Sequence, residues 1–462
     1  MHKNMRKQAT IIMLTFVFAL VVCGAVAAAD NSTVNATNSS NLSSDATPAA
    51  TAPAADTTST SQQTAASNQQ ASSTPATTSG GDPRIVGDPT CYTTIQDAVN
   101  HAIKGDVIIV DCGVYNENVV INTMLTLIGQ EGAVVVADNS NKPVFKINSG
   151  GSGTTITGFT IMGGSDGIEL NGVNNCEISE NTIVSNKDGI ELNNADFNCI
   201  KDNEIKYNLD DGISLNYADG NTIKDNKITT NGDDGISLYR SEGNKITDNK
   251  INSNLDDGVS LYSSDWNDII GNEINKNYYD GIALYESNGN LVKCNDIIDN
   301  QGKGVLIAGS KGNEILKNDI ETCIPCSVCI YVKDIDGITS ELNEVHGNCL
   351  IATGENSYAI INNSCKKLNA QCNWFGSAKD PKCKIGGSGV TLYCPWLKEE
   401  PKKCGCHKEK KSEETTTKSA KTAKAAKVTA AAGVPMQTTG APLALLALAL
   451  LAVFGGLLPR RK

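Results

Sequence analysis

A repeat of 23 residues runs through the middle of the chain, and it constrains the fold more than any other feature. The glycines of D-G-I-type turns recur at steps of 23, and Gly167 precedes the first of them by 22: Gly189, Gly212, Gly235, Gly258, Gly281 and Gly304. Asparagine follows the same step in columns that begin at Asn198, Asn203 and Asn208. Asparagine disfavours helix and strand interiors and favours turns. A chain with 48 asparagines, many of them in register, is therefore expected to turn at fixed intervals.

Apolar residues in the repeat stand singly or alternate as I-x-L, which is the period of a strand and not of a helix. Strands this short cannot form an ordinary sheet, but a coil with three corners lets each strand pair with the same strand of the next coil. Isoleucine and leucine then stack inward, corner asparagines adopt left-handed geometry or form amide ladders, and glycine gives the D-G turn its positive φ. The sequence predicts an all-β fold, a parallel β-helix of about 12 coils of about 23 residues.

The ends of such a solenoid need caps, because each coil covers only its neighbours. Residues 94–102 (TIQDAVNHA) predict a short amphipathic cap helix over the first coil. Cysteines crowd the C-terminal end, where the repeat decays and a Cys-rich cap is expected. The predicted β-helix domain spans residues 83–396.

The N-terminal sequence predicts export. Residues 1–29 combine a basic start, a short apolar core and small residues for cleavage, as in a secretory signal peptide. Residues 30–82 are rich in Ser, Thr and Ala, and they are expected to be disordered and glycosylated. Four glycosylation candidates lie in that segment and a fifth lies in the coils: Asn31, Asn35, Asn38, Asn41 and Asn362.

The C-terminal sequence predicts attachment to a membrane. Residues 397–440 form a stalk rich in Lys, Glu, Thr and Ala, and residues 441–462 are an apolar stretch closed by two arginines and a lysine. The stretch is long enough to cross a bilayer, so it predicts a transmembrane anchor or a sorting signal. The protein is then expected to be secreted, displayed at the cell surface and membrane-anchored through its C-terminus.

Charge narrows the choice of partner. The net charge is −12, and residues 82–396 carry 23 basic and 43 acidic side chains. This domain lacks the basic footprint that phosphate binding requires, so no nucleic acid partner is expected. Cell-envelope polymers or glycans are the expected partners, together with self-assembly.

Cysteines of an exported chain are expected to form disulfides. Cys176 and Cys199 stand one coil apart in the sequence, which would place their α-carbons within disulfide range. Cys91 and Cys112 would tie the cap helix to the first coil. These two pairs are the disulfide candidates, and the other pairings stay open.

Aspartates precede the glycines of four successive coils: Asp211, Asp234, Asp257 and Asp280. Stacked carboxylates repel one another unless a cation or hydrogen bonds intervene. Calcium prefers oxygen ligands, so a structural calcium ion is the one cofactor that the pattern predicts. The alternative is that each aspartate caps its own turn and faces water. A catalytic site would break the repeat, whereas these carboxylates continue it, and no catalytic residue is predicted.

Tyrosines form a second candidate site. Tyr239, Tyr262 and Tyr285 each follow an inward-facing leucine, so period-two alternation points them outward. Such a strip would bind sugars or a partner molecule by stacking. The alternative is that the rings only stack on one another between coils.

Several segments resemble a known family. The stretch TIQDAVNHAIKGDVIIVDCGVYNENVVIN, the GFTI and DGIEL coils and a terminal NWFG…CPWL are similar to the right-handed parallel β-helix surface proteins of methanogenic archaea. These are described as NosD-type, pectin-lyase-like, adhesin-like or S-layer proteins. The C-terminal segment also resembles the surface-sorting tails of archaeal exported proteins. The resemblance implies the fold and its hand but says little about function, because the same fold serves lyases, hydrolases, epimerases, adhesins and lattice proteins.

These features predict a secreted, surface-anchored structural or adhesin-like envelope protein, with an S-layer subunit as one form. The alternative is an extracellular polysaccharide-acting lyase, hydrolase or epimerase of the pectin-lyase-like type. The non-enzymatic role is favoured, because the chain shows no Ser-His-Asp set and no phosphate-binding loop.

Overall fold

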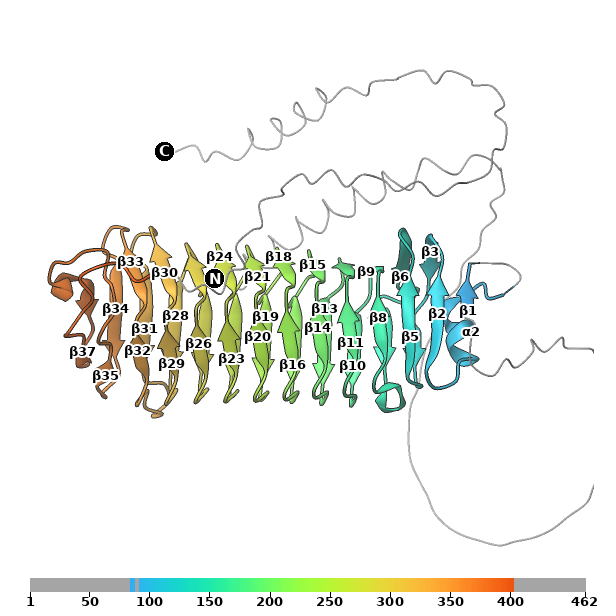
Figure 1. Ribbon diagram of the computed structural model, residues 1–462, viewed down its shortest axis with the longest axis horizontal. Coiled ribbons are helices and arrows are strands. Elements are labelled where there is room, and N and C mark those ends of the chain that lie inside the picture. The colour runs from blue at the N-terminus through green and yellow to red at the C-terminus, as the bar shows by residue number, and fades with distance from the viewer. Residues whose placement is uncertain (1–83, 88–90, 403–462) are drawn as a thin grey trace, which may run out of the picture. The chain divides into compact units, whose positions relative to one another are not determined.

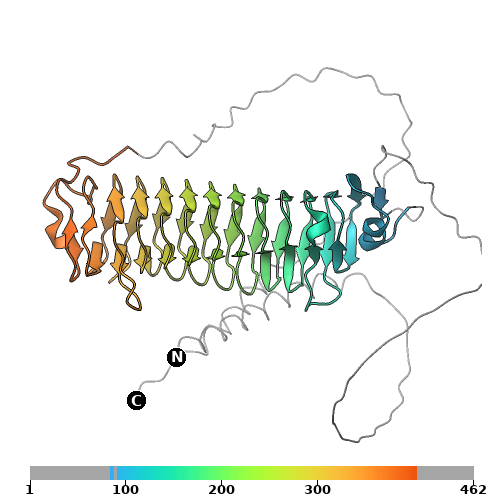
Figure 2. The ribbon, with the colours of Figure 1, turned by 90° about the horizontal axis from the view of Figure 1, so that it is seen from below.

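The structure, a computed structural model, describes residues 84–87 and 91–402. In this part of the chain, 37 short strands form three parallel sheets of 14, 12 and 11 strands. The coils stack along one axis, and a typical coil gives one strand to each sheet (Figures 1 and 2). The predicted all-β parallel β-helix is confirmed, and the sheet sizes agree with the expected number of coils.

The three sheets are named here A, C and B in order of size. Sheet A contains β1 (Arg84–Val86), β2 (Asp106–Val110), β5 (Leu125–Gly129), β8 (Thr155–Thr157), β11 (Glu177–Ser179), β14 (Cys199–Lys201), β17 (Thr222–Lys224), β20 (Lys245–Thr247), β23 (Asp268–Ile270), β26 (Leu291–Lys293), β29 (Glu314–Leu316), β32 (Glu344–His346), β35 (Leu368–Asn369) and β37 (Thr391–Leu392). Sheet C contains β4 (Val119–Ile121), β7 (Phe145–Ile147), β10 (Asp166–Asn171), β13 (Asp188–Asn193), β16 (Ile213–Asn216), β19 (Ile236–Tyr239), β22 (Val259–Tyr262), β25 (Ile282–Tyr285), β28 (Lys303–Ala308), β31 (Val328–Lys333), β34 (Tyr358–Asn363) and β36 (Ile385–Gly386). Sheet B contains β3 (Gly113–Asn116), β6 (Ala133–Val136), β9 (Thr160–Met162), β12 (Thr182–Val184), β15 (Glu204–Lys206), β18 (Lys227–Thr229), β21 (Lys250–Asn252), β24 (Glu273–Asn275), β27 (Asp296–Ile298), β30 (Asp319–Thr322) and β33 (Cys349–Ala352).

The core consists of aliphatic side chains stacked in columns. In sheet C, Ile213 pairs with Ile236 and Leu215 pairs with Leu238, and all four side chains are buried. Each coil therefore covers the apolar surface of the coil before it, at the spacing of neighbouring strands. The predicted inward columns of isoleucine and leucine are confirmed.

Asparagines at the corners form buried amide ladders, as expected. The side-chain amide of Asn221 donates to Oδ1 of Asn244 at 3.1 Å, and the backbone N–H of Asn221 donates to the same oxygen at 2.8 Å. The amide of Asn221 also donates to the carbonyl of Ala195 in the preceding coil, at 2.9 Å. The columns that start at Asn203 and Asn208 repeat this pattern. The ladders thus satisfy corner groups that would be costly to bury without a partner.

In the three asparagine ladders, left-handed backbone geometry falls on the residue before the asparagine and not on the asparagine itself. Phe197 (φ 57°), Asp202 (56°) and Tyr207 (56°) precede the first members of the three ladders. The prediction that the corner asparagines themselves adopt this geometry is wrong. Asparagine is required there for the hydrogen bonds of its side chain.

The glycines of the D-G turns are required for close packing. A Cβ on Gly212 would lie 2.5 Å from Cγ2 of Ile228 and 2.6 Å from the carbonyl oxygen of Gly235, closer than such atoms pack. The φ of Gly212 lies outside the left-handed region. The predicted positive φ is therefore wrong, and the absence of a side chain explains the glycine column instead.

The coil length changes from 22 to 23 residues at one corner. Thr182 in β12 pairs with Glu204 in β15, a step of 22, whereas Ile190 in β13 pairs with Ile213 in β16, a step of 23. The extra residue therefore lies between β15 and β16, where sheet B turns into sheet C. This corner positions the acidic residues described below.

The N-terminal end is covered by the predicted helix, α2 (Ile95–Asn100). The hydroxyl of Thr94 accepts the N–H of Asp97 and caps the first turn. The carboxylate of Glu117 accepts the N–H groups of Ile95 and Gln96 at 2.8 Å each, which fixes the helix to the coil beneath it.

The C-terminal end is closed by the last strands and a 3-10 turn at Pro381–Lys384, with Tyr393 and Trp396 packed against the core. Asn362 lies in β34 and is fully buried, and its amide donates to the carbonyl of Val390 at 2.9 Å. The prediction that Asn362 carries a glycan is therefore wrong for the folded protein.

The predicted signal peptide, the candidates Asn31, Asn35, Asn38 and Asn41, most of the stalk and the C-terminal anchor lie outside the described residues. Within residues 84–87 and 91–402, no helix has the length and apolar character needed to cross a bilayer.

We expect Asn244→Ala to lower the free energy of unfolding by about 3 kcal/mol, because it leaves buried donors and an acceptor of two coils without partners. Thermal unfolding followed by circular dichroism measures the change. Lys245→Ala, at the exposed neighbouring position, is the control and should change the melting temperature little. Equal shifts in the two variants would contradict the structural role of the ladder.

Candidate functional site

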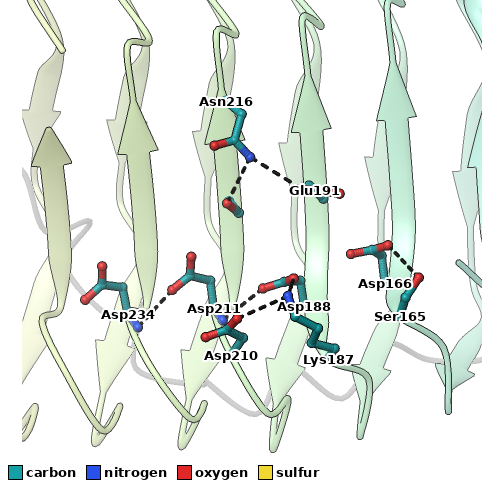
Figure 3. A network of polar contacts seen from close by, with 10 residues as sticks. Ser165, Asp166, Lys187, Asp188, Glu191, Asp210, Asp211, Asn216 and Asp234 are labelled. Carbon is teal, nitrogen blue, oxygen red and sulfur yellow. Dashed lines mark hydrogen bonds and ion pairs between the residues drawn. The ribbon is translucent and has the colours of Figure 1, made fainter. Parts of the chain in front are cut away.

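Sheet C carries three rows of side chains that differ in chemistry and run along the axis. The acidic row lies at or just before the strand starts and contains Asp188, Asp211, Asp234, Asp257 and Asp280. The middle row contains Glu169, Glu191, Ser214, Ser237, Ser260 and Ala283. The end row contains Asn193, Asn216, Tyr239, Tyr262 and Tyr285. Figure 3 shows Asp188, Asp211 and Asp234 of the acidic row near the strand starts and Asn216 nearer the strand ends.

The acidic row is a ladder in which each carboxylate accepts a backbone N–H from the next coil. Oδ1 of Asp188 accepts the N–H of Asp211 at 3.1 Å, and Oδ1 of Asp211 accepts the N–H of Asp234 at 3.0 Å (Figure 3). Asp234, Asp257 and Asp280 continue the pattern. The alternative prediction, that each aspartate caps its own turn, is wrong, because the acceptor belongs to the preceding coil.

The extra residue of the 23-residue coil explains this ladder. In the 22-residue coil, Asp188 donates its N–H to the carbonyl of Ser165. In the longer coil, the N–H of Asp210 donates to the carbonyl of Lys187, and the N–H of Asp211 donates to the carboxylate of Asp188. The side chain thus supplies an acceptor that the backbone does not, and the extra residues form an outer acidic row of Asp210, Asp233 and Asp256.

Lysines form ion pairs with the aspartates at the two ends of the acidic row. Lys187 Nζ lies 2.6 Å from Asp188 and 3.1 Å from Asp210, and Lys303 Nζ lies 3.9 Å from Asp280. Among the described residues, no ion pair joins a lysine or arginine to Asp211 or Asp234. The middle of the row therefore concentrates negative charge without a basic side chain beside it.

The protonation of the row follows from this arrangement. Burial, and then repulsion between neighbouring aspartates, raises the pKa of Asp211, Asp234 and Asp257 well above the usual range for aspartate. Burial also raises the pKa of Asp280, although the N–H and ammonium groups of Lys303 oppose the effect. The row therefore resists full ionisation at pH values where an ordinary aspartate is charged, unless a cation compensates its charge.

Carboxylates of the two acidic rows come close enough to share a metal ion. One group consists of Asp210, Asp211 and Asp233, and the next consists of Asp233, Asp234 and Asp256, with one oxygen from each residue within 4.8 Å of the others. An all-oxygen donor set of this kind fits calcium. Asp211 and Asp234, two of the predicted calcium ligands, thus lie close to Asp210, Asp233 and Asp256 of the outer acidic row. Calcium itself stays a prediction.

The tyrosines of the end row are partly exposed and stack between coils. The rings of Tyr239 and Tyr262 lie 5.7 Å apart at 17°, and Tyr217 meets Tyr239 edge-on at 5.6 Å. The guanidinium of Arg240 lies 5.2 Å from the ring of Tyr239. Tyr262 is 45% exposed, whereas Tyr285 is half-buried beside the acidic row, and its burial raises the pKa of its hydroxyl. The rings therefore stack on one another between coils, as the alternative expected, and binding of sugars or a partner by the exposed Tyr262 stays a prediction.

A second group of carboxylates, on β10 and β13, was missed by the sequence analysis. Asp166, Glu169, Asp188 and Glu191 lie on these adjacent strands, and Glu169 pairs in register with Glu191. Burial, followed by repulsion from Glu191, raises the pKa of Asp166 to about 7. The signal was the motif DGIELN in two successive coils, where glutamate takes the outward position that serine holds in later coils.

The predicted disulfides are not formed. Glu177 is the residue that pairs with Cys199, so Cys176 is offset by one position. A one-residue offset turns a side chain to the other face of a strand, and accordingly Cys176 is buried while Cys199 is partly exposed, both as free cysteines. Strand β1 separates Cys91 from Cys112, because Val86 pairs with Tyr92 on one side and Val110 on the other, and Cys112 is a free, exposed cysteine.

By its fold, the chain is a parallel β-helix repeat protein. A family model described as the right handed beta helix region matches residues 144–290 and 256–375, which together cover half of the chain. The chain belongs to this family, and the hand implied by the sequence resemblance is confirmed.

The chain is similar to known proteins over parts of its length. A cell surface glycoprotein of Methanothermus fervidus is 36% identical over 92 residues, which are 20% of this chain and 15% of that protein. The A-module of the mannuronan C-5 epimerase of Azotobacter vinelandii superposes with a TM-score of 0.53 at 17% identity, over 67% of this chain and 95% of the module. The Dettilon tailspike protein superposes with a TM-score of 0.50 at 17% identity, over 65% and 66% of the two chains. At such low identity, the two structures show the fold alone.

We expect the protein without divalent cations to melt at a higher temperature at pH 5 than at pH 7.5. The folded-state pKa values of the acidic row are raised, so the stabilising protonation is complete below the unfolded pKa near 4 and is lost as pH rises towards the folded values. Asp234→Asn keeps a hydrogen-bond acceptor but removes one charge. It should raise stability at pH 7.5 by about 1 kcal/mol and flatten the pH dependence. A variant as pH-dependent as the parent protein would contradict the assignment.

Calcium should raise the melting temperature at pH 7.5, and chelation should reverse the rise, because an ion that binds only the folded state stabilises it. Asp233→Asn removes the carboxylate shared by both groups and should abolish the calcium-dependent shift. Asp225→Asn changes an exposed aspartate outside the acidic rows and should keep it. Differential scanning calorimetry with calcium or chelator measures each shift, and an unchanged melting temperature of the parent protein rejects the calcium site.

Proposed function

We propose that this protein is secreted, held at the cell surface through its C-terminal segment, and uses sheet C to bind polysaccharides or other glycans of the envelope. The tyrosines of the end row carry this proposal. Tyr262 offers an exposed ring on which a sugar can stack. Beside it, small serines leave the middle row open, and the acidic row lies across the same strands.

The surface location is supported by the similarity to the Methanothermus fervidus cell surface glycoprotein. The sequence adds the predicted signal peptide and the predicted C-terminal anchor, which flank the β-helix. Self-assembly into a surface layer is a narrower form of the same proposal. The role is structural or adhesin-like, with sheet C as the glycan-binding surface.

A second candidate function is polysaccharide processing on the same sheet. The carboxylates on β10 and β13 favour it, because the pKa of Asp166, at about 7, suits a general acid and the neighbouring Glu169 and Glu191 could act with it. The two functions differ in outcome, since a binding protein leaves the glycan intact whereas an enzyme releases new chain ends.

Tyr262→Ala should weaken glycan binding by about fivefold, because one aromatic stacking contact contributes on the order of 1 kcal/mol. Affinity electrophoresis through gels with soluble polysaccharides measures this, and Tyr207→Ala is the control, since Tyr207 is similarly exposed but lies outside sheet C. The polysaccharides that bind are then incubated with the protein and assayed for reducing ends and unsaturated products. Equal binding by the parent protein and Tyr262→Ala would reject the proposed surface, and turnover would favour the second candidate.

A further inference from the structure

One corner of the solenoid, between sheets C and A, carries bulky side chains where the backbone is left-handed. The residues at this position in eight successive coils all have φ between 55° and 66°: Asn175, Phe197, Gly220, Gly243, Trp266, Gly289, Gly312 and Leu342. This set is called the left-handed column below. Glycine and asparagine suit such a backbone, whereas a bulky residue there is strained. Phe197, Trp266 and Leu342 therefore need an explanation other than local conformational preference.

Stability does not explain these residues either, because they are among the most exposed apolar side chains described. Phe197 is 65% exposed, Trp266 67% and Leu342 78%. Each combines backbone strain with exposed apolar surface, and both features are unfavourable in a free monomer. Residues that cost the fold in two ways are candidates for a binding surface, and their repetition along the axis distinguishes Phe197 and Trp266 from Tyr207, which is the one aromatic residue of its column.

The two aromatic rings are held flat by glycines of the next coil. A Cβ on Gly220 would lie 2.6 Å from Cε1 of Phe197, and a Cβ on Gly289 would lie 2.5 Å from Cε3 and Cζ3 of Trp266. Each ring thus occupies the place of the side chain that the next coil lacks. It covers a glycine of the next coil, while most of its side chain stays exposed to a ligand.

The column repeats every three coils. Bulky residue, glycine, glycine is the order from Phe197 to Gly243 and again from Trp266 to Gly312, and Leu342 follows. Three coils correspond to about 14 Å along the axis. No atom lies within 4 Å of a Cβ placed on Gly243 or Gly312, so the surface between the bulky residues is open. Flat platforms at regular distances with open surface between them fit an extended chain that lies along the axis.

A row of polar side chains runs beside the column and narrows the class of ligand. It contains Asp196, Asp219, Glu242, Asp265 and Asn288. Side chains of this row link successive coils in two runs, since Oδ1 of Asp219 accepts the N–H of Glu242 at 2.7 Å and Oδ1 of Asp265 accepts the N–H of Asn288 at 2.6 Å. Carboxylates beside aromatic platforms can accept hydrogen bonds from hydroxyl groups, and they repel a polyanion. A neutral polysaccharide satisfies both conditions, whereas a uronic-acid polymer does not.

We propose that the left-handed column is a binding edge for a neutral polysaccharide, with Phe197 and Trp266 as platforms that stack on sugar rings three coils apart. This edge lies at the corner beyond the strand ends of sheet C and does not use Tyr262. It adds a ligand class to the proposed glycan binding, and its failure can be distinguished from failure of the sheet C surface.

The test compares the full-length protein with the double variant Phe197→Gly/Trp266→Gly. Glycine is what neighbouring coils use at this position, so the variant should fold and should melt no lower than the parent protein. The control is Tyr207→Gly, since Tyr207 is an exposed aromatic residue at φ 56° in a different column. The probes are soluble neutral polysaccharides (β-glucan, mannan and dextran) and polygalacturonate, in affinity electrophoresis and isothermal titration calorimetry.

The expected result is that at least one neutral polysaccharide binds the parent protein and binds the double variant about tenfold more weakly, a change of about 1.4 kcal/mol. Tyr207→Gly should bind as the parent protein does. The proposal is overturned if no neutral polysaccharide binds, if only polygalacturonate binds, if the control loses as much affinity as the double variant, or if the double variant changes self-association in sedimentation but not glycan affinity. Loss of binding in Tyr262→Ala alone would reject this edge and leave the sheet C surface standing.

Discussion

Hydrogen bonds passed from each coil to the next at the corners are the interaction on which the rest of the structure depends. Strands of three residues have no stability by themselves, and the turns between them bury polar groups that a single coil cannot satisfy. Asn221 shows the solution, since it contacts the coil before it through Ala195 and the coil after it through Asn244. Because the corners of the coils from Asn181 onward use this connection, their sheets stay in register and their aliphatic columns stay aligned.

The acidic row uses the same device with a charged side chain. Lengthening the coil by one residue leaves the N–H of Asp211 to be satisfied by the carboxylate of Asp188. Hydrogen bonding requires a carboxylate or amide oxygen at this place, but repetition stacks like charges along the sheet. The raised pKa values and the close carboxylates of Asp210, Asp211 and Asp233 follow from that conflict. The hydrogen-bonded aspartate ladder and the candidate cation site therefore both result from the one added residue in each coil.

The sequence predicts the features that repeat with each coil. It does not predict the features that change when the pairing of two strands shifts by one residue. The inward columns, the asparagine ladders and the cap helix follow from spacing and polarity alone. The bridge between Cys176 and Cys199 was wrong because those coils have 22 residues and not 23, which turns the two side chains to opposite faces. Gly212 and Asn362 were misread because their roles depend on atoms of a neighbouring coil, Ile228 and Val390, that composition does not identify. The carboxylates of β10 and β13 were hidden because they resemble ordinary repeat positions.

In the proposed binding edge, the number of coils between Phe197 and Trp266 sets the distance between the two aromatic rings. Because neighbouring coils meet through nearly identical contacts, duplication or loss of one 23-residue coil would leave the fold intact. The same event between Phe197 and Trp266 would move the two rings apart or together by about 4.8 Å, one strand spacing. Selection on ligand length would then act on the number of coils between two aromatic residues. The coils that carry Gly220 and Gly243 therefore determine the length of ligand that both rings can contact at once.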